Sequence, residues 1–159
     1  MIDIEIPVFN AVYDAVQGEY PSCAIYNDRP QSMVKFPAVV LVEQDNTRYP
    51  EGVLPRDEEI FLVTRFDDVP AEKYAEIMYQ VDIFCDDQKG AKTKCKSIAA
   101  LVDSVLTGLN FNRMSLSPMP NTDPNIIRYT GRYRAVVSAP KVTEHENGLP
   151  DYDYILYRR

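Results

Sequence analysis

The sequence predicts an α+β fold, a largely antiparallel or mixed β-sheet packed on one face by two α-helices. Apolar and polar residues alternate through residues 75–85 and 127–137, as in strands with one solvated face. Apolar residues recur at spacings of three and four through residues 91–109, which indicates an amphipathic helix. A chain of 159 residues is about one domain, and sheet and helices of this kind pack most simply as two layers.

A first helix is expected over residues 7–17. It is marked by four apolar residues at helical spacing, a proline suited to the first turn and a glycine suited to the end: Phe9, Val12, Tyr13, Val16, Pro7 and Gly18. The alternation of Ile2, Ile4 and Ile6 also permits a short strand before this helix. The pattern does not decide between the two.

The apolar run 36–42 lacks polar alternation, which favours a central strand covered on both faces. Residues 44–59 contain Pro50, Gly52 and Pro55 among several acids. They are expected to form a long exposed loop, leading into a further strand at residues 60–64. Long loops in compact domains are often binding elements.

The strand at residues 75–85 should carry Glu76, Gln80 and Asp82 on its solvated face. Asp86, Asp87 and Gly90 interrupt the pattern, and a helix of about residues 89–108 should then lie on the sheet. Its apolar stripe consists of Ala91, Cys95, Ile98, Val102, Val105 and Leu109. Its outward residues are Lys92, Lys96 and Asp103.

A short strand at residues 113–117 precedes a loop at residues 118–124, whose three prolines should exclude ladder pairing. The strand at residues 127–137 then places Arg128, Arg132 and Arg134 on its polar face. These arginines could line an acidic partner surface or form the solvated face of a sheet.

We expect a single domain over residues 1–139 and a C-terminal arm over residues 140–159. The arm carries Tyr152, Tyr154 and Tyr157 after a turn near Gly148. Tyrosine is favoured in interfaces, so the arm is expected to pair with a neighbouring subunit.

Composition limits the functional classes. A net charge of −7 and a pI near 4.7 oppose binding to phosphate backbones. No apolar run is long enough for a membrane span, and the acidic N-terminus does not resemble a secretory signal. Three cysteines without C-x-x-C spacing favour free, buried thiols in a cytoplasm.

The sequence predicts no catalytic residue, metal or cofactor. The one histidine, His145, has no cysteine near it, which disfavours a zinc site or a Ser-His-Asp triad. The acidic pairs Asp67-Asp68 and Asp86-Asp87 lack the spacing and central glycine of a calcium loop. The glycines are scattered singly, so no phosphate-binding loop is expected.

Three segments together resemble a known family. The first is Phe36-Pro-Ala-Val-Val. The second is Tyr79-Gln-Val-Asp-Ile-Phe-Cys, which runs into a lysine-rich helix. The third is a late strand with the short runs Arg128-Tyr129 and Arg132-Tyr133-Arg134. Their order over residues 5–139 resembles the tail-terminator, or tail-completion, proteins of long-tailed bacteriophages and prophages. The motifs consist of aromatic and apolar positions, and no invariant signature is among them.

The resemblance implies a structural virion protein, assembled in the bacterial cytoplasm, that forms a hexameric ring on the head-proximal end of the tail tube. Its partners would be its own copies, the major tail-tube protein and the head-tail connector, and DNA would pass through the channel without specific binding. The acidic loop could face this channel or a neighbour. The candidate interface residues are Glu51, Asp57, Glu58, Glu59, Arg128, Arg132, Arg134, Tyr152, Tyr154 and Tyr157.

Two other interpretations remain open at this stage. One is a head-closure or connector-adaptor protein of the same neck. The other, from a different class, is a small cytoplasmic enzyme or ligand-binding domain with a pocket between helix and sheet. Conservation of a polar cluster around Tyr79, Asp82 and Arg132 among related sequences would favour the last of these.

Overall fold

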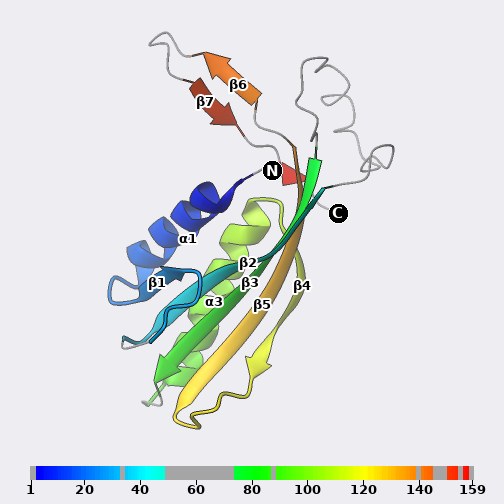
Figure 1. Cartoon of the computed structure of the whole chain (residues 1–159). Helices are drawn as coiled ribbons and strands as arrows, with labels where there is room; N and C mark the ends of the chain where they lie inside the picture. Colours follow the sequence, from blue (N-terminus) through cyan, green and yellow to red (C-terminus); the bar gives the residue numbers. More distant parts are fainter. Residues whose placement is uncertain are drawn as a thin grey trace.

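The computed structural model describes residues 3–32, 35–48, 74–86, 89–138, 141–144, 150–153 and 156–157. Figure 1 shows the order of the elements along the chain. The helices and strands are α1 (Glu5–Glu19), β1 (Ala24–Asn27), β2 (Ala38–Arg48), β3 (Tyr74–Asp86), α3 (Ala91–Gly108), β4 (Asn112–Met119), β5 (Ile126–Ser138), β6 (Lys141–Glu144), β7 (Pro150–Asp153) and β8 (Leu156–Tyr157).

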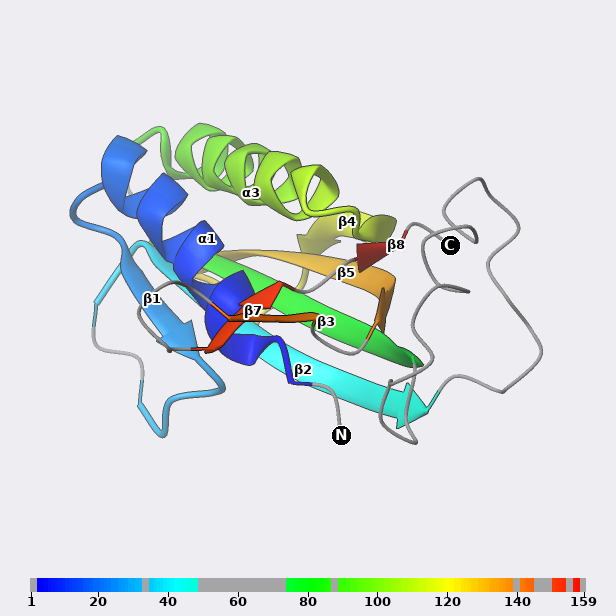
Figure 2. The ribbon, with the colours of Figure 1, turned by 90° about the horizontal axis from the view of Figure 1, so that it is seen from above.

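The sheet is mixed and has the strand order β1-β2-β3-β5-β4. β1 runs parallel to β2, while the pairs β2–β3, β3–β5 and β4–β5 are antiparallel. Both helices lie on the same face of this sheet (Figure 2). The predicted α+β fold class, with two helices on one face of a mixed sheet, is therefore confirmed.

Helix α1 covers the sheet near β1 and β2 (Figures 1 and 2). Its buried residues Val8, Val12 and Val16 recur every fourth position, as expected for one helix face. Ile6 lies inside this helix, so the alternative of a strand through Ile4 and Ile6 is wrong. The helix also continues past Gly18 to Glu19.

Helix α3 packs on β3 and β5 and against α1. The predicted stripe from Ala91 to Val102 is buried, but the last buried residue is Leu106, while Val105 and Leu109 are only partly buried against the core. The shift of the stripe follows from the helical period of 3.6, which rotates successive positions around the helix.

Strand β2 is longer than predicted. Its first four residues, Ala38 to Leu41, are all buried, so this part is covered on both faces as expected. The strand then continues to Arg48, with a register shift between Glu43 and Asp45. The prediction that residues 44–48 belong to a loop is therefore wrong, because a bulge lets the ladder continue past this point. Residues 49–64, with the rest of that loop and the predicted strand, lie outside the described residues.

Strand β4 includes Pro118 and Met119, which pair with Tyr129 and Arg128 of β5. The expectation that the prolines exclude pairing here is wrong for Pro118. β4 is the last strand of the sheet order, and an edge strand tolerates a proline, whose missing N–H can face away from the ladder.

The chain after Ser138 forms a short antiparallel hairpin of β6 and β7, which extends beyond the main sheet (Figure 1). β8 then returns to the main sheet and pairs with Val136 and Val137 of β5. No helix in the described part of the chain is long and apolar enough to cross a membrane.

Candidate functional site

The three arginines of β5 lie on the face of the sheet away from the helices. Successive side chains of a strand point to opposite faces, and Tyr129 and Tyr133 pack into the core cluster beneath the helices. Arg128, Arg132 and Arg134 therefore share the other face. The structure brings these three predicted interface residues together on one strand.

Asp82 of β3 binds the first of these arginines. Arg128 donates to Asp82 Oδ1 from Nη2 at 2.9 Å and from Nε at 3.1 Å. The Thr130 hydroxyl donates to the same oxygen, and Gln80 Nε2 donates to Oδ2 at 3.0 Å. Four donated hydrogen bonds thus stabilise a carboxylate whose residue is only 2% exposed.

This network corrects the prediction of a solvated face on β3. Gln80, Asp82 and Thr130 are all buried, although their alternation in the sequence is that of polar, outward residues. The Arg128 guanidinium lies 5.5 Å from the ring centroid of Phe84, at a distance typical of cation–π contacts. Long side chains on this face therefore cover the shorter polar ones.

The other two arginines differ in their surroundings. Arg134 Nη1 lies 3.2 Å from Glu76 Oε1, and both side chains are about one-quarter exposed. Arg132 is exposed, and it has no ion-pair partner among the described residues. Of the three arginines, Arg132 is thus the one whose charge is available to a partner.

On the helix side, Asp103 of α3 joins the helix to two strands. It accepts hydrogen bonds from Tyr133 Oη at 3.1 Å and from Arg113 Nη1 at 2.9 Å. The expectation that Asp103 faces solvent is wrong, because its carboxylate is hydrogen-bonded to residues of β4 and β5. Burial, with a further contribution from Asp103, raises the pKa of Tyr133, so this phenol remains a protonated donor.

A second tyrosine, Tyr79, donates to Glu43 Oε2 at 3.3 Å. Burial raises the pKa of Tyr79 and also that of Glu43. Tyr79 belongs to the core cluster under the helices, whereas Asp82 and Arg132 point to the opposite face of the sheet. Tyr79 therefore lies on the other face of the sheet from Asp82 and Arg132.

The three cysteines are free and buried, as predicted. Burial raises the pKa of Cys23 to about 11. A hydrogen bond with Cys95 lowers the pKa of Cys85, whereas the same hydrogen bond and burial raise that of Cys95. The Cys95 Sγ lies 3.6 Å from the Ile83 carbonyl oxygen.

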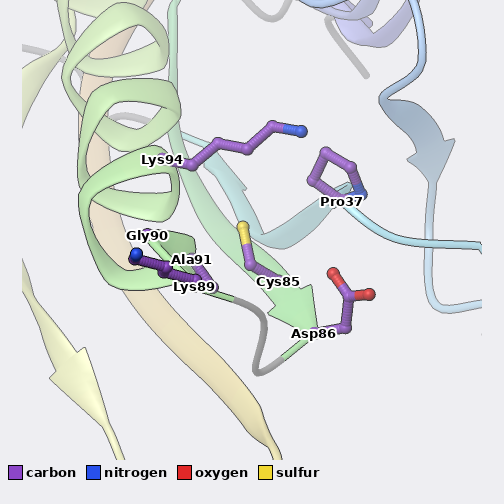
Figure 3. Close-up of a pocket in the computed structure, with 7 residues that line it drawn as sticks. All are labelled: Pro37, Cys85, Asp86, Lys89, Gly90, Ala91 and Lys94. Atoms are coloured by element: carbon purple, nitrogen blue, oxygen red, sulfur yellow. The ribbon is translucent and has the colours of Figure 1, made fainter.

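A small pocket of 190 Å³ lies where β3 ends and α3 begins. In Figure 3 the Lys94 side chain extends toward Pro37, and the Cys85 thiol points toward the Lys94 side chain. The complete lining is Pro37, Cys85, Asp86, Lys89, Gly90, Ala91 and Lys94. This volume is below the roughly 300–1,000 Å³ of typical small-molecule sites. Within the described residues, no three His, Cys, Asp or Glu side chains converge to hold a metal ion.

The remaining predicted interface residues divide into two groups. Glu51, Asp57, Glu58, Glu59 and Tyr154 lie outside the described residues. Tyr152 lies in β7 and Tyr157 in β8, so the backbone of each is part of a strand. Their roles remain predictions.

Four large apolar residues are exposed in the described part of the structure. The expectation that one of them, Tyr13, lies on the apolar stripe of the first helix is wrong, because the buried face of α1 consists of Val8, Val12 and Val16. Ile6 and Tyr13 lie on α1, and Met114 and Met119 on β4. The signal for the first pair was their spacing of seven positions, which returns to the same helix face. For the methionines the signal was weaker, since methionine is ordinary in a core.

Comparison with models of known protein families matched none of them, and no curated protein is significantly similar in sequence. The fold and the side chains define the class instead: a small α+β protein with helices on one face of a mixed sheet. The polar groups of its other face are mostly paired with one another.

Proposed function

We propose that this chain is a phage tail-terminator protein. In this role, copies form a ring on the head-proximal end of the tail tube, end its polymerisation and make the joint to the head-tail connector. The assembled protein would belong to the virion neck, and the partners would be the chain's own copies, the major tail-tube protein and the connector.

One observation carries the proposal. The three segments that resemble tail terminators lie at the start of β2, on β3 and on β5, which are neighbours in the sheet. The second of them leads through a turn into α3, the lysine-containing helix of the resemblance. Segments far apart in the sequence thus belong to one continuous piece of the fold, as a shared architecture requires.

The charge of the chain fits the same role. A net charge of −7 disfavours adhesion to DNA, since basic side chains supply most of the affinity for phosphates. An acidic channel would let DNA pass without retention. Glu51, Asp57, Glu58 and Glu59 are the side chains that we propose for the channel or a neighbouring subunit, and the tyrosines of residues 140–159 are proposed for contacts between copies.

The experiment is to add the purified protein to polymerising tail-tube protein from the same phage and to measure tube lengths by negative-stain electron microscopy. We expect shorter tubes that carry a ring at one end only. Bovine serum albumin at the same concentration serves as a control for non-specific effects. Unchanged tube lengths together with bare ends would contradict the proposal.

The head-closure interpretation predicts a different result in the same assay. A connector adaptor would leave tube length unchanged and would bind the isolated connector ring. Adding the connector in a parallel sample, followed by sedimentation, therefore separates the two neck proteins.

A further inference from the structure

Among the described residues, the large exposed apolar side chains form two pairs on different sides of the fold. Ile6 and Tyr13 on α1 are 69% and 43% exposed, and Met114 and Met119 on β4 are 50% and 45% exposed. α1 covers the β1–β2 end of the sheet, and β4 is the strand at the other end (Figure 1). Binding of a partner that covers exposed apolar groups of this kind is favourable, because it removes apolar surface from water.

The charges around the two pairs have opposite signs. Helix α1 contains three acidic residues and no lysine or arginine, and Asp14 beside Tyr13 is exposed. Strand β4 contains no acidic residue, and its one arginine, Arg113, is paired with Asp103. Its neighbour β5 presents the exposed Arg132, which supplies the positive charge of this face. The α1 face is therefore apolar and acidic, while the β4 face is apolar and basic.

The opposite charges of the two faces favour a contact between the α1 face of one copy and the β4 face of another. A two-fold dimer would bring each face against an identical one, and like charges would repel. A head-to-tail contact would instead place the acidic α1 face of one copy against the basic β4 face of the next. Such a heterologous contact leaves one face free at each end, so it repeats. The assembly closes into a ring where the rotation between neighbouring copies divides a full turn, and it otherwise continues as a filament.

We propose that a second copy of this chain docks its α1 face, Ile6, Tyr13 and Asp14, on the β4 face, Met114, Met119 and Arg132. The flexible methionines suit a surface that must adapt to a helix. This inference rests on the proposed function for the closed ring, whereas the contact itself is argued from exposure and charge.

Two variants test the direction of the contact. Ile6→Lys with Tyr13→Lys disables the α1 face, and Met114→Ser with Met119→Ser removes the apolar contacts of the β4 face. Sedimentation velocity over a concentration series should show each variant associating at least about tenfold more weakly than the wild type. Lys92→Glu with Lys96→Glu, on the exposed side of α3, is the matched control and should associate like the wild type.

The mixture of the two disabled variants is the decisive sample. Each retains the face that the other lacks, so an equimolar mixture should give a 1:1 dimer and nothing larger. Circular dichroism melts of each variant show that it is folded, and isothermal titration of one into the other gives the affinity.

Two results overturn the contact. One is a wild-type chain that stays monomeric up to its solubility limit. The other is wild-type assembly that persists in both disabled variants. The tube-length assay separates this inference from the proposed function: variants that still cap tubes as rings refute the contact and leave the terminator role standing.

Discussion

Gly131 of β5 occupies a position where the neighbouring aromatic ring leaves no space for a side chain. A Cβ atom built there would lie 2.6 Å from Cε2 of Tyr133, far inside van der Waals contact. The ring cannot move freely, because the Tyr133 hydroxyl is bonded to Asp103 of α3. Glycine at this position therefore lets the tyrosine lie across its own strand and reach the helix.

We predict that Gly131→Ala lowers the free energy of unfolding by about 1–3 kcal/mol, the usual cost of overpacking a core. Urea denaturation followed by circular dichroism measures it. Gly18→Ala is the matched control, since a Cβ at Gly18 meets nothing within 4 Å. In helix α1 that change should be neutral or stabilising by up to about 1 kcal/mol. Equal stabilities for the two variants would show that Tyr133 adjusts without cost.

At the scale of elements, the sequence correctly predicted the features that depend on the local spacing of apolar residues. The alternation in β3 and β5 and the helical spacing in α3 each reflect which side of an element faces the core. The predictions that failed concern contacts between residues that are distant in the sequence. Asp82 is buried by Arg128, 46 residues further along, and alternation indicates a face without revealing what covers it.

The same reasoning explains the errors at strand ends and in the candidate site. β2 passes the position expected for a loop because it bulges against β3, and Pro118 fits in β4 because that strand is an edge. Both features follow from the strand order. In the candidate site, the common face of Arg128, Arg132 and Arg134 could be predicted from their parity. Which of the three remains available could not, since ion pairing is tertiary.

Helix α3 offers the clearest test at this scale. Val102 is 1% exposed and lies in the stripe that packs on the sheet. Val102→Asp should abolish the cooperative thermal melt, because it buries a charge for which this apolar site offers no partner. Ala100→Asp, two positions earlier on the exposed side, should cost only about 0.7 kcal/mol of helix propensity. A cooperative melt for Val102→Asp would contradict the packing of α3.

For the whole molecule, the division into a domain of residues 1–139 and an arm of residues 140–159 remains a prediction. The core cluster that the described residues form runs from Ile4 to Val137. β6 and β7 pair with each other, and β8 joins the main sheet through two residue pairs with β5. The fold of the sheet and helices is therefore expected to depend little on the chain after Ser138, which leaves that segment available for contacts between copies.

Truncation after Ser138 tests this division. It removes the two pairings between β8 and β5, and each backbone hydrogen bond contributes roughly 0.5–1.5 kcal/mol. The truncated chain should therefore keep a cooperative melt at a lower midpoint, while its association in sedimentation velocity weakens because the proposed tyrosine contacts are absent. Replacing Tyr152, Tyr154 and Tyr157 by serine in the full chain provides the control, since it should weaken association and leave the β8 backbone pairing in place. Loss of the folded monomer on truncation would assign the segment to the core, and unchanged association in both variants would remove it from the interface between copies.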